Sequence, residues 1–298
     1  MGTPAIAVIG ASGQVAKALA RAAHSRGEDL VCVGRPAADI ADPASLADVF
    51  QRLKPALVIN AAAYTAVDKA ESEPDAARAA NELGPAHLAA LCAANTVPLI
   101  HISTDYVFDG RATVPYTEDD QRAPINVYGH TKSAGEDAIR ALLPQHIIMR
   151  TAWIYGSDGQ NFLKTMLRLG AERDVLRVVA DQHGTPTSAD DLAHALLDVS
   201  GAVLRAGNAA PWGTYHAAGT GQTTWYGFAH EIFRQASEAG LKVPKLEAIE
   251  TAAYPAPAAR PRYSVLNTSK MHRTFGVVLP PWQHSLARCF KTFVPRNT

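Results

Sequence analysis

Ala5-Ile-Ala-Val-Ile-Gly10-Ala-Ser-Gly13-Gln-Val-Ala16 is the stretch that decides the fold. An apolar run of strand length leads into a turn with two glycines, and an amphipathic helical segment follows. Gly10 permits the tight turn, and Gly13 lets backbone N–H groups approach a pyrophosphate at the positive end of the helix. Ala16 stands where such turns often carry a third glycine. The stretch predicts a nucleotide-binding turn, and the alternative is an ordinary strand–helix turn without a ligand.

Short apolar runs rich in Val and Ile alternate with helical segments through the first half of the chain. The predicted strands are residues 5–9, 30–33, 57–60, 98–103 and 145–150. Asp42 is expected to cap a helix that begins at Pro43, and Ser72 to cap an Ala-rich helix that ends before Val97. Strands that alternate with helices predict an α/β fold, a doubly wound (Rossmann-type) parallel sheet with ligands at the carboxyl ends of the strands.

After residue 150 this regularity weakens, and we expect a smaller α/β substrate lobe. Helices are predicted at residues 161–170 and 188–200, a strand at 175–180 and a loop at 201–211. The predicted domains are an NADP-binding Rossmann domain of residues 1–153, joined by returning segments of roughly 175–215, and a substrate-binding lobe of residues 154–174 and 216–298.

Composition narrows the class of protein. The 298 residues carry a formal net charge of zero and 19% charged residues, so neither a nucleic acid nor a membrane surface is expected as a partner. Cys32, Cys92 and Cys289 are odd in number and far apart, which favours buried thiols in a reducing compartment. No signal segment precedes the first strand and no apolar run reaches about 18 residues. We expect a cytoplasmic protein.

The residues after the second predicted strand indicate which nicotinamide nucleotide binds. An acidic residue there accepts a hydrogen bond from the ribose 2′-hydroxyl, whereas a basic one favours a 2′-phosphate. The chain has Val33-Gly34-Arg35 and no acid before Asp39. Arg35 therefore favours NADPH, with NADH as the other candidate, unless Arg35 is an ordinary surface arginine.

Tyr128 and Lys132 are the candidate catalytic pair. Four residues make just over one helical turn, so both side chains project from one helix face. A neighbouring ammonium is expected to lower the pKa of the phenol towards neutral pH, which suits a proton donor. Thr104, at the end of the fourth strand, would share the substrate oxygen with Tyr128. The alternative is a tyrosine and a lysine on a helix surface.

Blocks along nearly the whole chain resemble the extended short-chain dehydrogenase/reductases and, within them, the dTDP-4-dehydrorhamnose reductases. The most specific are Asn60-Ala-Ala-Ala-Tyr-Thr-Ala-Val-Asp-Lys-Ala-Glu71 and Ser103-Thr-Asp-Tyr-Val-Phe-Asp-Gly110. The others are Tyr128-Gly-His-Thr-Lys-Ser-Ala-Gly-Glu136, Arg150-Thr-Ala-Trp-Ile-Tyr-Gly156, Asn161-Phe-Leu, Asp181-Gln-His-Gly-Thr-Pro-Thr187 and Arg260-Pro-Arg-Tyr-Ser-Val-Leu266.

The resemblance implies hydride transfer from NADPH, or NADH, to the C4 ketone of dTDP-4-dehydro-L-rhamnose, giving dTDP-L-rhamnose. Tyr128 would be the general acid, Lys132 its modulator and Thr104 the hydroxyl partner. The implied cofactor contacts are Gly10, Ser12, Gly13, Gln14, Val15, Arg35, Asp39, Ile40, Ala61, Ala62, Ala63, Tyr128 and Lys132. The implied contacts to the nucleotide sugar are Tyr64, Thr65, Asp105, Tyr106, Trp153 and Arg260. An indole suits the apolar face of a deoxysugar, and an arginine suits a diphosphate.

Some members of the resembled family bind Mg²⁺ at a dimer contact through carboxylates, one of them on the first helix. Residues 14–26 of this chain contain no Asp or Glu. Asp190 and Asp191 open a later helix, where the helix dipole already favours acids. We therefore predict no metal requirement and a monomer or weak homodimer. Two further departures are His130, expected to be a solvated helix residue, and Tyr263, expected to alter the wall of the sugar site.

Two other functions compete with this interpretation. One is a related epimerase, dehydratase or reductase that acts on another nucleotide sugar. The other is a non-catalytic subunit resembling the regulatory beta subunit of methionine adenosyltransferase. Tyr128, Lys132 and Thr104 argue against a dead site.

Overall fold

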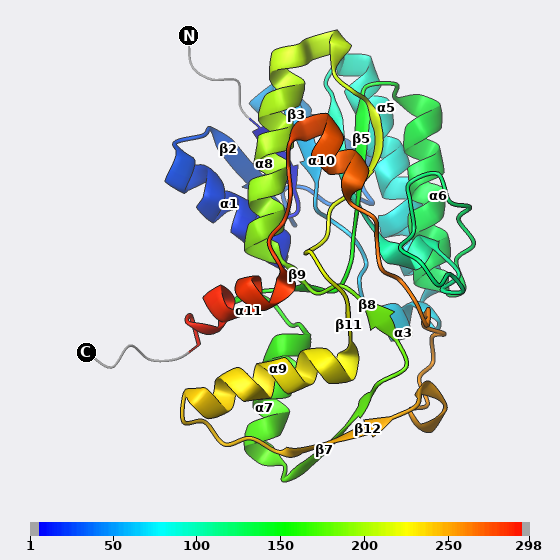
Figure 1. Cartoon of the computed structure of the whole chain (residues 1–298). Coiled ribbons are helices and arrows are strands. Elements are labelled where there is room, and N and C mark those ends of the chain that lie inside the picture. The colour runs from blue at the N-terminus through cyan, green and yellow to red at the C-terminus, as the bar shows by residue number, and fades with distance from the viewer. Residues whose placement is uncertain (1–5, 294–298) are drawn as a thin grey trace.

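The computed structural model describes residues 6–293, and a six-stranded parallel sheet forms its centre (Figure 1). The sheet order is β10-β5-β4-β3-β1-β2, so the chain reverses its direction of travel between β1 and β3. The strands are β1 (Ile6–Ile9), β2 (Leu30–Val33), β3 (Leu57–Asn60), β4 (Leu99–Thr104), β5 (His146–Thr151) and β10 (Gly213–His216). The predicted doubly wound α/β fold is confirmed. Ala5, the first residue of the first predicted strand, lies outside the described residues.

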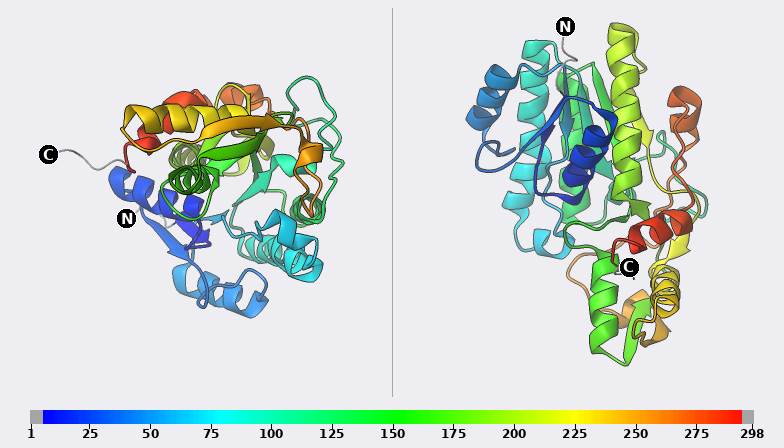
Figure 2. Two further views of the ribbon diagram at one scale, coloured as in Figure 1. Left: turned by 90° about the horizontal axis from the view of Figure 1, so that it is seen from below. Right: turned by 90° about the vertical axis from the view of Figure 1, so that its left-hand side faces the viewer.

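Helices cover both faces of this sheet (Figure 2). On one face lie α1 (Gln14–Arg26) and α8 (Ala189–Ala206), and on the other α2 (Pro43–Leu53), α5 (Gly84–Asn95) and α6 (Val127–Leu142). Alternate residues of the strands enter the two cores, as Val8 does on the α1 side and Ala7 on the α2 side. This double burial explains why the strands are almost uninterrupted apolar runs.

Two predicted helix starts have different outcomes. Asp42 caps α2 as predicted, because its side chain accepts a hydrogen bond from the Ala44 N–H and Pro43 occupies the first position. The predicted cap at Ser72 is wrong, since α4 (Pro74–Arg78) begins at its proline. Proline has its φ fixed for a helix and lacks only an N–H that would be unpaired there. The Ala-rich stretch is also interrupted by the π-helix η1 (Ala79–Leu83) before α5 begins.

A smaller lobe lies below the sheet in Figure 1 and contains α7 (Phe162–Glu172), α9 (Trp225–Glu238), β7 (Val175–Val179) and β12 (Lys245–Ile249). β7 and β12 pair in parallel, so the segment near residue 175 lies in this lobe. The prediction had placed this segment in the part of the chain that returns to the first domain. The predicted loop at 201–211 is wrong in its first part, because α8 continues to Ala206 with Val203 buried against the main core.

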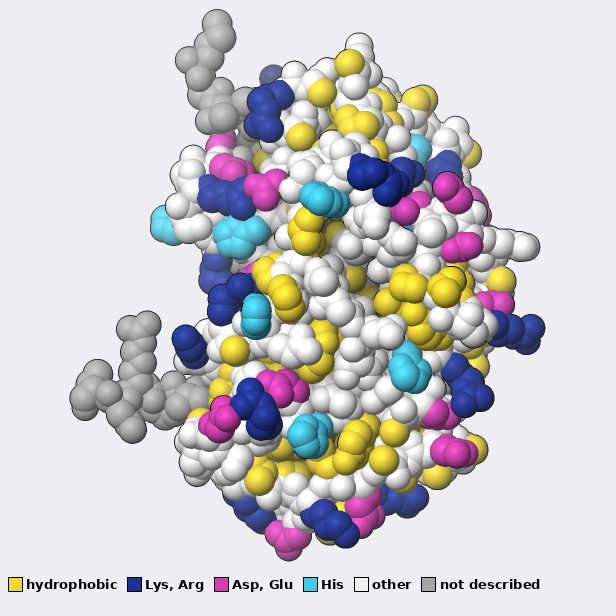
Figure 3. All heavy atoms as spheres, viewed as in Figure 1, with side chains coloured by type: hydrophobic (Ala, Val, Ile, Leu, Met, Phe, Trp, Pro, Cys, Tyr) yellow, Lys and Arg dark blue, Asp and Glu magenta, His cyan; other side chains and the backbone are white. Residues whose placement is uncertain are grey.

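The remaining elements are short. They are β6 (Ile154–Tyr155), β8 (His183–Gly184), β9 (Thr187–Ser188), β11 (Thr223–Thr224), α3 (Val67–Ala70), α10 (Ser269–Phe275), α11 (Trp282–Phe290) and the 3₁₀ turns η2 (Asp105–Val107), η3 (Gly207–Ala209) and η4 (Thr251–Ala253). Figure 3 shows acidic and basic side chains interspersed over one face, in keeping with the zero net charge. No helix within residues 6–293 has the length and apolar character of a membrane span. All three cysteines are free thiols, two of them buried and Cys32 half-buried.

Candidate active site

A cavity of about 550 Å³ lies at the carboxyl ends of the strands, near the point where the strand order reverses. It gathers residues from the turn before α1, the ends of β3, β4 and β5, the start of α6 and the start of α9. The predicted site residues that line it are Gly13, Gln14, Val15, Ala61, Ala62, Ala63, Thr65, Thr104, Asp105, Tyr106, Tyr128, Lys132 and Trp153. The predicted site residues outside its lining are Gly10, Ser12, Arg35, Asp39, Ile40, Tyr64 and Arg260.

The turn between β1 and α1 has the geometry of an anion site. Gly10 has φ +108°, and a Cβ there would lie 3.1 Å from the Ala61 carbonyl carbon. This places the turn directly against the residues that follow β3. Gly13 precedes α1 without a side-chain cap, so the first N–H groups of the helix are left for a ligand. The residues present therefore fit the pyrophosphate of a dinucleotide.

Residues predicted on the adenine side lie farther out. Arg35 is exposed just after β2, and no ion pair involves it within the described part of the chain. The Asp39 carboxylate accepts from the Ala41 N–H, whereas Ile40 packs in the core beneath Gly84. Arg35 is thus available to a 2′-phosphate, and the Ile40 side chain serves the core.

The three predicted catalytic residues meet at the floor of the cavity. Thr104 ends β4, and α6 carries Tyr128 and Lys132 one turn apart. The start of α6 is fixed by Asn126, whose side chain accepts from the Gly129 N–H at 2.7 Å. Gly129 itself leaves no room for a Cβ, which would lie 2.3 Å from the Tyr106 carbonyl oxygen. This close contact brings the Tyr128 ring to the end of β4.

The predicted lowering of the Tyr128 pKa is not found in this form of the protein. Burial raises the pKa of Tyr128 to about 12, and hydrogen bonding with Thr104 only partly opposes it. Burial also lowers the pKa of Lys132 to about 8. The Lys132 amine is turned to the strand behind it, where it donates to the Ile102 carbonyl oxygen at 2.7 Å. Tyr128 therefore stays a neutral phenol, the protonation state that a general acid needs.

Asp105 is the most unusual polar group in the lining. Its side chain is 2% exposed, and one carboxylate oxygen accepts from the Thr104 hydroxyl at 3.0 Å. The other oxygen, Oδ2, has no hydrogen bond of ordinary geometry among residues 6–293, although the Ser264 side chain lies close enough to lower the pKa of the carboxyl. Burial raises the pKa of Asp105 to about 6. A buried oxygen left unpaired at a cavity wall fits a ligand hydroxyl group.

An aromatic pair forms the wall on the lobe side, and sequence analysis found only one of its members. Trp153, at φ +44°, stacks on Trp225 with ring centroids 3.5 Å apart and planes 6° apart. Trp225 begins α9, and no local pattern marks it as a site residue. The other lining residues that were not predicted are Val67, Ile102, Ser103, Thr151, Ala152, Ile154, Gly159 and Gln160.

Two predicted substrate contacts are engaged elsewhere in the protein. Arg260 donates to Asp68 at 2.8 Å, and the Tyr64 hydroxyl donates to Glu73 at 2.8 Å. Tyr263, expected in the sugar-site wall, donates its hydroxyl hydrogen to Gln222 at 3.1 Å. His130 is exposed, as predicted.

The carboxylates near α1 are paired with arginines. Arg21 contacts Asp158 and donates to Asp190 at 2.8 Å, while Asp191 accepts from Ser285 and Arg288. Within the described range no three His, Cys, Asp or Glu side chains are grouped to hold a metal ion. That the protein needs no metal stays a prediction.

Sequence and structure comparisons identify the family. The family described as "RmlD substrate binding domain" matches residues 4–294. A dTDP-4-dehydrorhamnose reductase of Sinorhizobium fredii is 44% identical over 283 residues, 95% of each chain. The chain belongs to the dTDP-4-dehydrorhamnose reductase family. The predicted family and enzyme class, an NADP-dependent oxidoreductase, are thereby confirmed.

Solved structures of this reductase family agree in fold. A dTDP-4-dehydrorhamnose reductase of Clostridium acetobutylicum has a TM-score of 0.90 and 39% identity, covering 97% of this chain and 99% of its own. The reductase of Bacillus anthracis, solved in complex with NADP, has a TM-score of 0.89 and 36% identity, covering 98% of this chain and all of its own. A UDP-glucose 4-epimerase of Thermus thermophilus, 18% identical at a TM-score of 0.79, shares the fold.

Proposed function

We propose that this chain reduces the C4 ketone of dTDP-4-dehydro-L-rhamnose to dTDP-L-rhamnose with NADPH, a step in the synthesis of a nucleotide sugar for cell-surface polysaccharide. The observation that carries the proposal is the meeting of Thr104, Tyr128 and Lys132 with the uncapped start of α1 in one cavity. Membership of the reductase family and the NADP complex of the Bacillus anthracis relative support it.

The chain's own residues account for binding and proton transfer. The amides at the start of α1 hold the diphosphate, and Lys132 binds hydroxyl groups of the ribose. NADPH, when bound, supplies the hydride. Tyr128 donates a hydrogen bond to the substrate ketone and passes its proton to that oxygen as the alcohol forms. Thr104 contacts the same oxygen and stabilises the charge that develops on it.

The finer assignments extend this proposal. Thr65, Asp105, Tyr106 and the Trp153 indole contact the sugar from the cavity wall, with Asp105 Oδ2 accepting a sugar hydroxyl. Tyr64 and Arg260 reach the nucleotide only if they leave Glu73 and Asp68. The monomeric or weakly dimeric state and the cytoplasmic location stay predictions.

The deciding experiment is NADPH oxidation with dTDP-4-dehydro-L-rhamnose by the wild type and by Tyr128→Phe. We expect turnover to fall by about 10²–10⁴-fold in the variant, because the proton donor is lost, while NADPH still binds. Tyr215→Phe is the matched control, since it removes a buried hydroxyl outside the cavity and should keep full turnover. Full activity of Tyr128→Phe would exclude this tyrosine as the acid.

The rival functions predict different results in the same preparation. An epimerase or dehydratase of this fold would be purified with tightly bound NAD and would not consume NADPH in proportion to substrate. A non-catalytic subunit would bind NADPH and show no turnover, and its Tyr128→Phe variant would match the wild type.

A further inference from the structure

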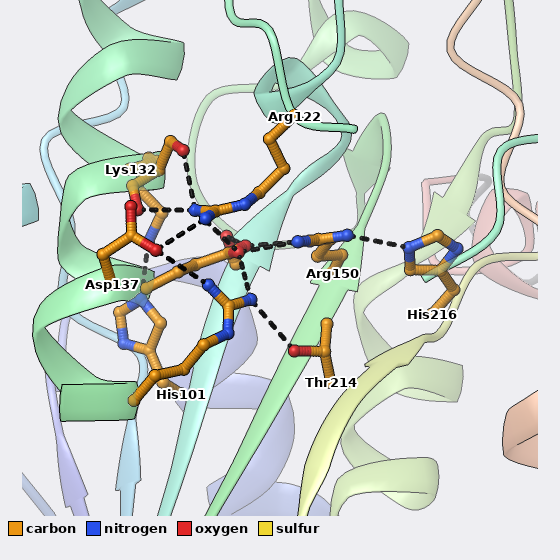
Figure 4. A network of polar contacts seen from close by, with 11 residues as sticks. His101, Arg122, Lys132, Asp137, Arg150, Thr214 and His216 are labelled. Atoms are coloured by element: carbon orange, nitrogen blue, oxygen red, sulfur yellow. Dashed lines mark hydrogen bonds and ion pairs between the residues drawn. The ribbon is translucent and has the colours of Figure 1, made fainter. Parts of the chain in front are cut away.

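His101 is a fully buried imidazole in strand β4, directly behind the catalytic lysine (Figure 4). Its Nδ1 lies 2.9 Å from the Asn60 side-chain nitrogen, and its Nε2 lies 3.2 Å from the Lys132 nitrogen. His101 thus links the end of β3 to α6 from beneath the cavity. The direction of these two hydrogen bonds determines what the imidazole does to Lys132.

The backbone fixes the Asn60 end of this chain of contacts. Asn60 Oδ1 accepts from the Ala62 N–H at 3.0 Å, so the amide NH₂ group is the part that faces His101. The reversed amide would set an NH₂ group against the Ala62 N–H. Because an NH₂ group only donates, His101 Nδ1 must be the acceptor. A neutral imidazole with an accepting Nδ1 carries its proton on Nε2.

The Nε2–H of His101 therefore points at the Lys132 nitrogen. An ammonium group has hydrogens on every free position, whereas a neutral amine has one lone pair that can accept. The same nitrogen donates to the Ile102 carbonyl oxygen. A neutral amine satisfies both contacts and keeps one N–H for the cavity that Lys132 lines.

We infer that His101 is a positioning residue that donates its Nε2–H to the Lys132 nitrogen and so favours the neutral amine form of Lys132 before ligands bind. The inference rests on the proposed function, because it assigns a second residue to the same reduction site. Protonation of Lys132 would place an N–H of its ammonium group against the Nε2–H of His101. The contact between the two side chains would then break, and the ammonium group would be free to turn to the cavity.

The charged groups around this pair are compatible with that state. Burial lowers the pKa of His101 well below its usual range, so the imidazole is neutral. Burial likewise lowers the pKa of Lys132 to about 8, although Glu136 on the same helix opposes that shift, so the neutral amine prevails above that pH. The Glu136 carboxylate is itself occupied by Arg150 on β5 and by Arg140 on α6, and His146 at the start of β5 bonds to the backbone.

The first test observes the tautomer in the intact wild-type protein. Long-range ¹H–¹⁵N NMR distinguishes a protonated from an unprotonated imidazole nitrogen, and His101→Leu assigns the signal. We expect His101 to be the Nε2–H tautomer with an unprotonated Nδ1 at pH 8. The Nδ1–H tautomer, or a doubly protonated ring, would overturn the inference. This measurement needs no substrate, so it stands apart from the test of the proposed function.

The second test follows the titration of Lys132 by NMR of ¹³C-labelled lysine, with Lys132→Met for assignment. His101→Leu should raise the Lys132 midpoint by about one pH unit, the value of one lost hydrogen bond. His101→Gln keeps an accepting oxygen and a donating nitrogen and should restore the wild-type midpoint. His146→Leu, a buried histidine that does not touch Lys132, is the control and should leave the midpoint unchanged.

The kinetic counterpart is the pH profile of kcat/KM for NADPH-dependent turnover, which reports groups of the free enzyme. The part of this profile that reflects the titration of Lys132 should shift in His101→Leu by the same amount as the NMR midpoint. In His101→Gln it should lie at the wild-type pH. An unchanged midpoint and profile in His101→Leu would refute the role of His101. Absence of turnover in the wild type would instead refute the proposed function, whatever the NMR result.

Discussion

Lys132 and Arg150 are two buried basic side chains at the same helix–strand interface, and only Arg150 is paired with a carboxylate. Each is 1% exposed. Arg150 donates from two nitrogens to the Glu136 carboxylate, at 2.9 and 2.8 Å. Lys132 forms no ion pair within residues 6–293 and contacts only an imidazole and a carbonyl oxygen.

Further contacts hold the Arg150–Glu136 pair in place (Figure 4). Glu136 also accepts from Ser103 at 2.6 Å and from Arg140 at 2.8 Å, and the Arg150 guanidinium lies 5.1 Å from the centre of the Phe108 ring. These contacts join α6, β4 and β5. A buried basic group that is paired with a carboxylate stays charged and stabilises the fold. A buried basic group without a carboxylate can change its protonation state near neutral pH.

The largest effect on stability is expected when the Glu136 carboxylate is removed. Glu136→Gln leaves Arg150 buried without a counter-charge and should lower the free energy of unfolding by about 3–5 kcal/mol. Urea unfolding followed by circular dichroism measures this change. Asp137→Asn, an exposed acid on the same helix, is the control and should cost less than about 1 kcal/mol. Equal losses in both variants would show that burial of the Glu136 carboxylate adds nothing to its effect on stability.

Loss of the lysine should act in the opposite direction on stability. Burial depresses the pKa of Lys132 from 10.5 to about 8, so its charged form is disfavoured by folding. Lys132→Met should therefore raise the free energy of unfolding at pH 7, by at most about 3 kcal/mol, while turnover falls by about 10²-fold. Because the unfolded chain holds the extra proton between pH 8 and 10.5, the stability advantage of the variant should shrink over that range. A destabilised Lys132→Met would contradict this.

Acid should remove the contribution of the Glu136–Arg150 pair. Burial alone would raise the pKa of Glu136, but the ion pair with Arg150 prevails and lowers it to about 2. A carboxyl group whose pKa is lowered by folding stabilises the folded protein above its pKa in the unfolded chain, which is near 4.5. That contribution is lost as the pH falls towards 2. The stability difference between wild type and Glu136→Gln should stay constant from pH 7 to 5 and narrow by up to about 3 kcal/mol below pH 4.5. Unfolding curves at stepwise pH measure it.

The smallest effect on stability is expected when an exposed ion pair is removed. Arg21 bridges α1 to Asp158 and Asp190, but its side chain is 49% exposed. Arg21→Ala should change the free energy of unfolding by no more than about 1 kcal/mol, and high salt should reduce that change further. A salt-independent loss comparable to that of Glu136→Gln would show that burial is not what separates the two pairs.

Features set by neighbouring residues could be predicted from the sequence. The β1–turn–α1 unit needs only an apolar run, glycines and a helical segment, and the Tyr128–Lys132 spacing places both side chains on one face of whatever helix forms. Asp42 with Pro43 similarly specifies a helix start. The strand alternation then determines the doubly wound sheet, and this brings the ends of β1, β3 and β4 to one edge.

Features set by distant packing could not be predicted. Trp225 reaches the cavity because α9 begins beside Trp153, 72 residues earlier in the chain, and Arg260 meets Asp68 across 192 residues. The pKa of Tyr128 depends on how deeply the ring is buried, which the helix spacing does not specify. The helix α8 continues past Gly201 because burial of the apolar residues beyond it stabilises the helix more than the glycine destabilises it.

Gly184 has a consequence for how such an enzyme could change its substrate. A Cβ there would lie 2.4 Å from the Trp153 indole, so no side chain can occupy the position unless the ring moves. Since Trp225 covers one face of that ring, the displaced indole would alter the shape of the sugar site while every residue of the cavity lining stayed the same. A new preference between nucleotide sugars could therefore arise from outside the cavity, and comparing KM for two such sugars in Gly184→Ala would reveal it.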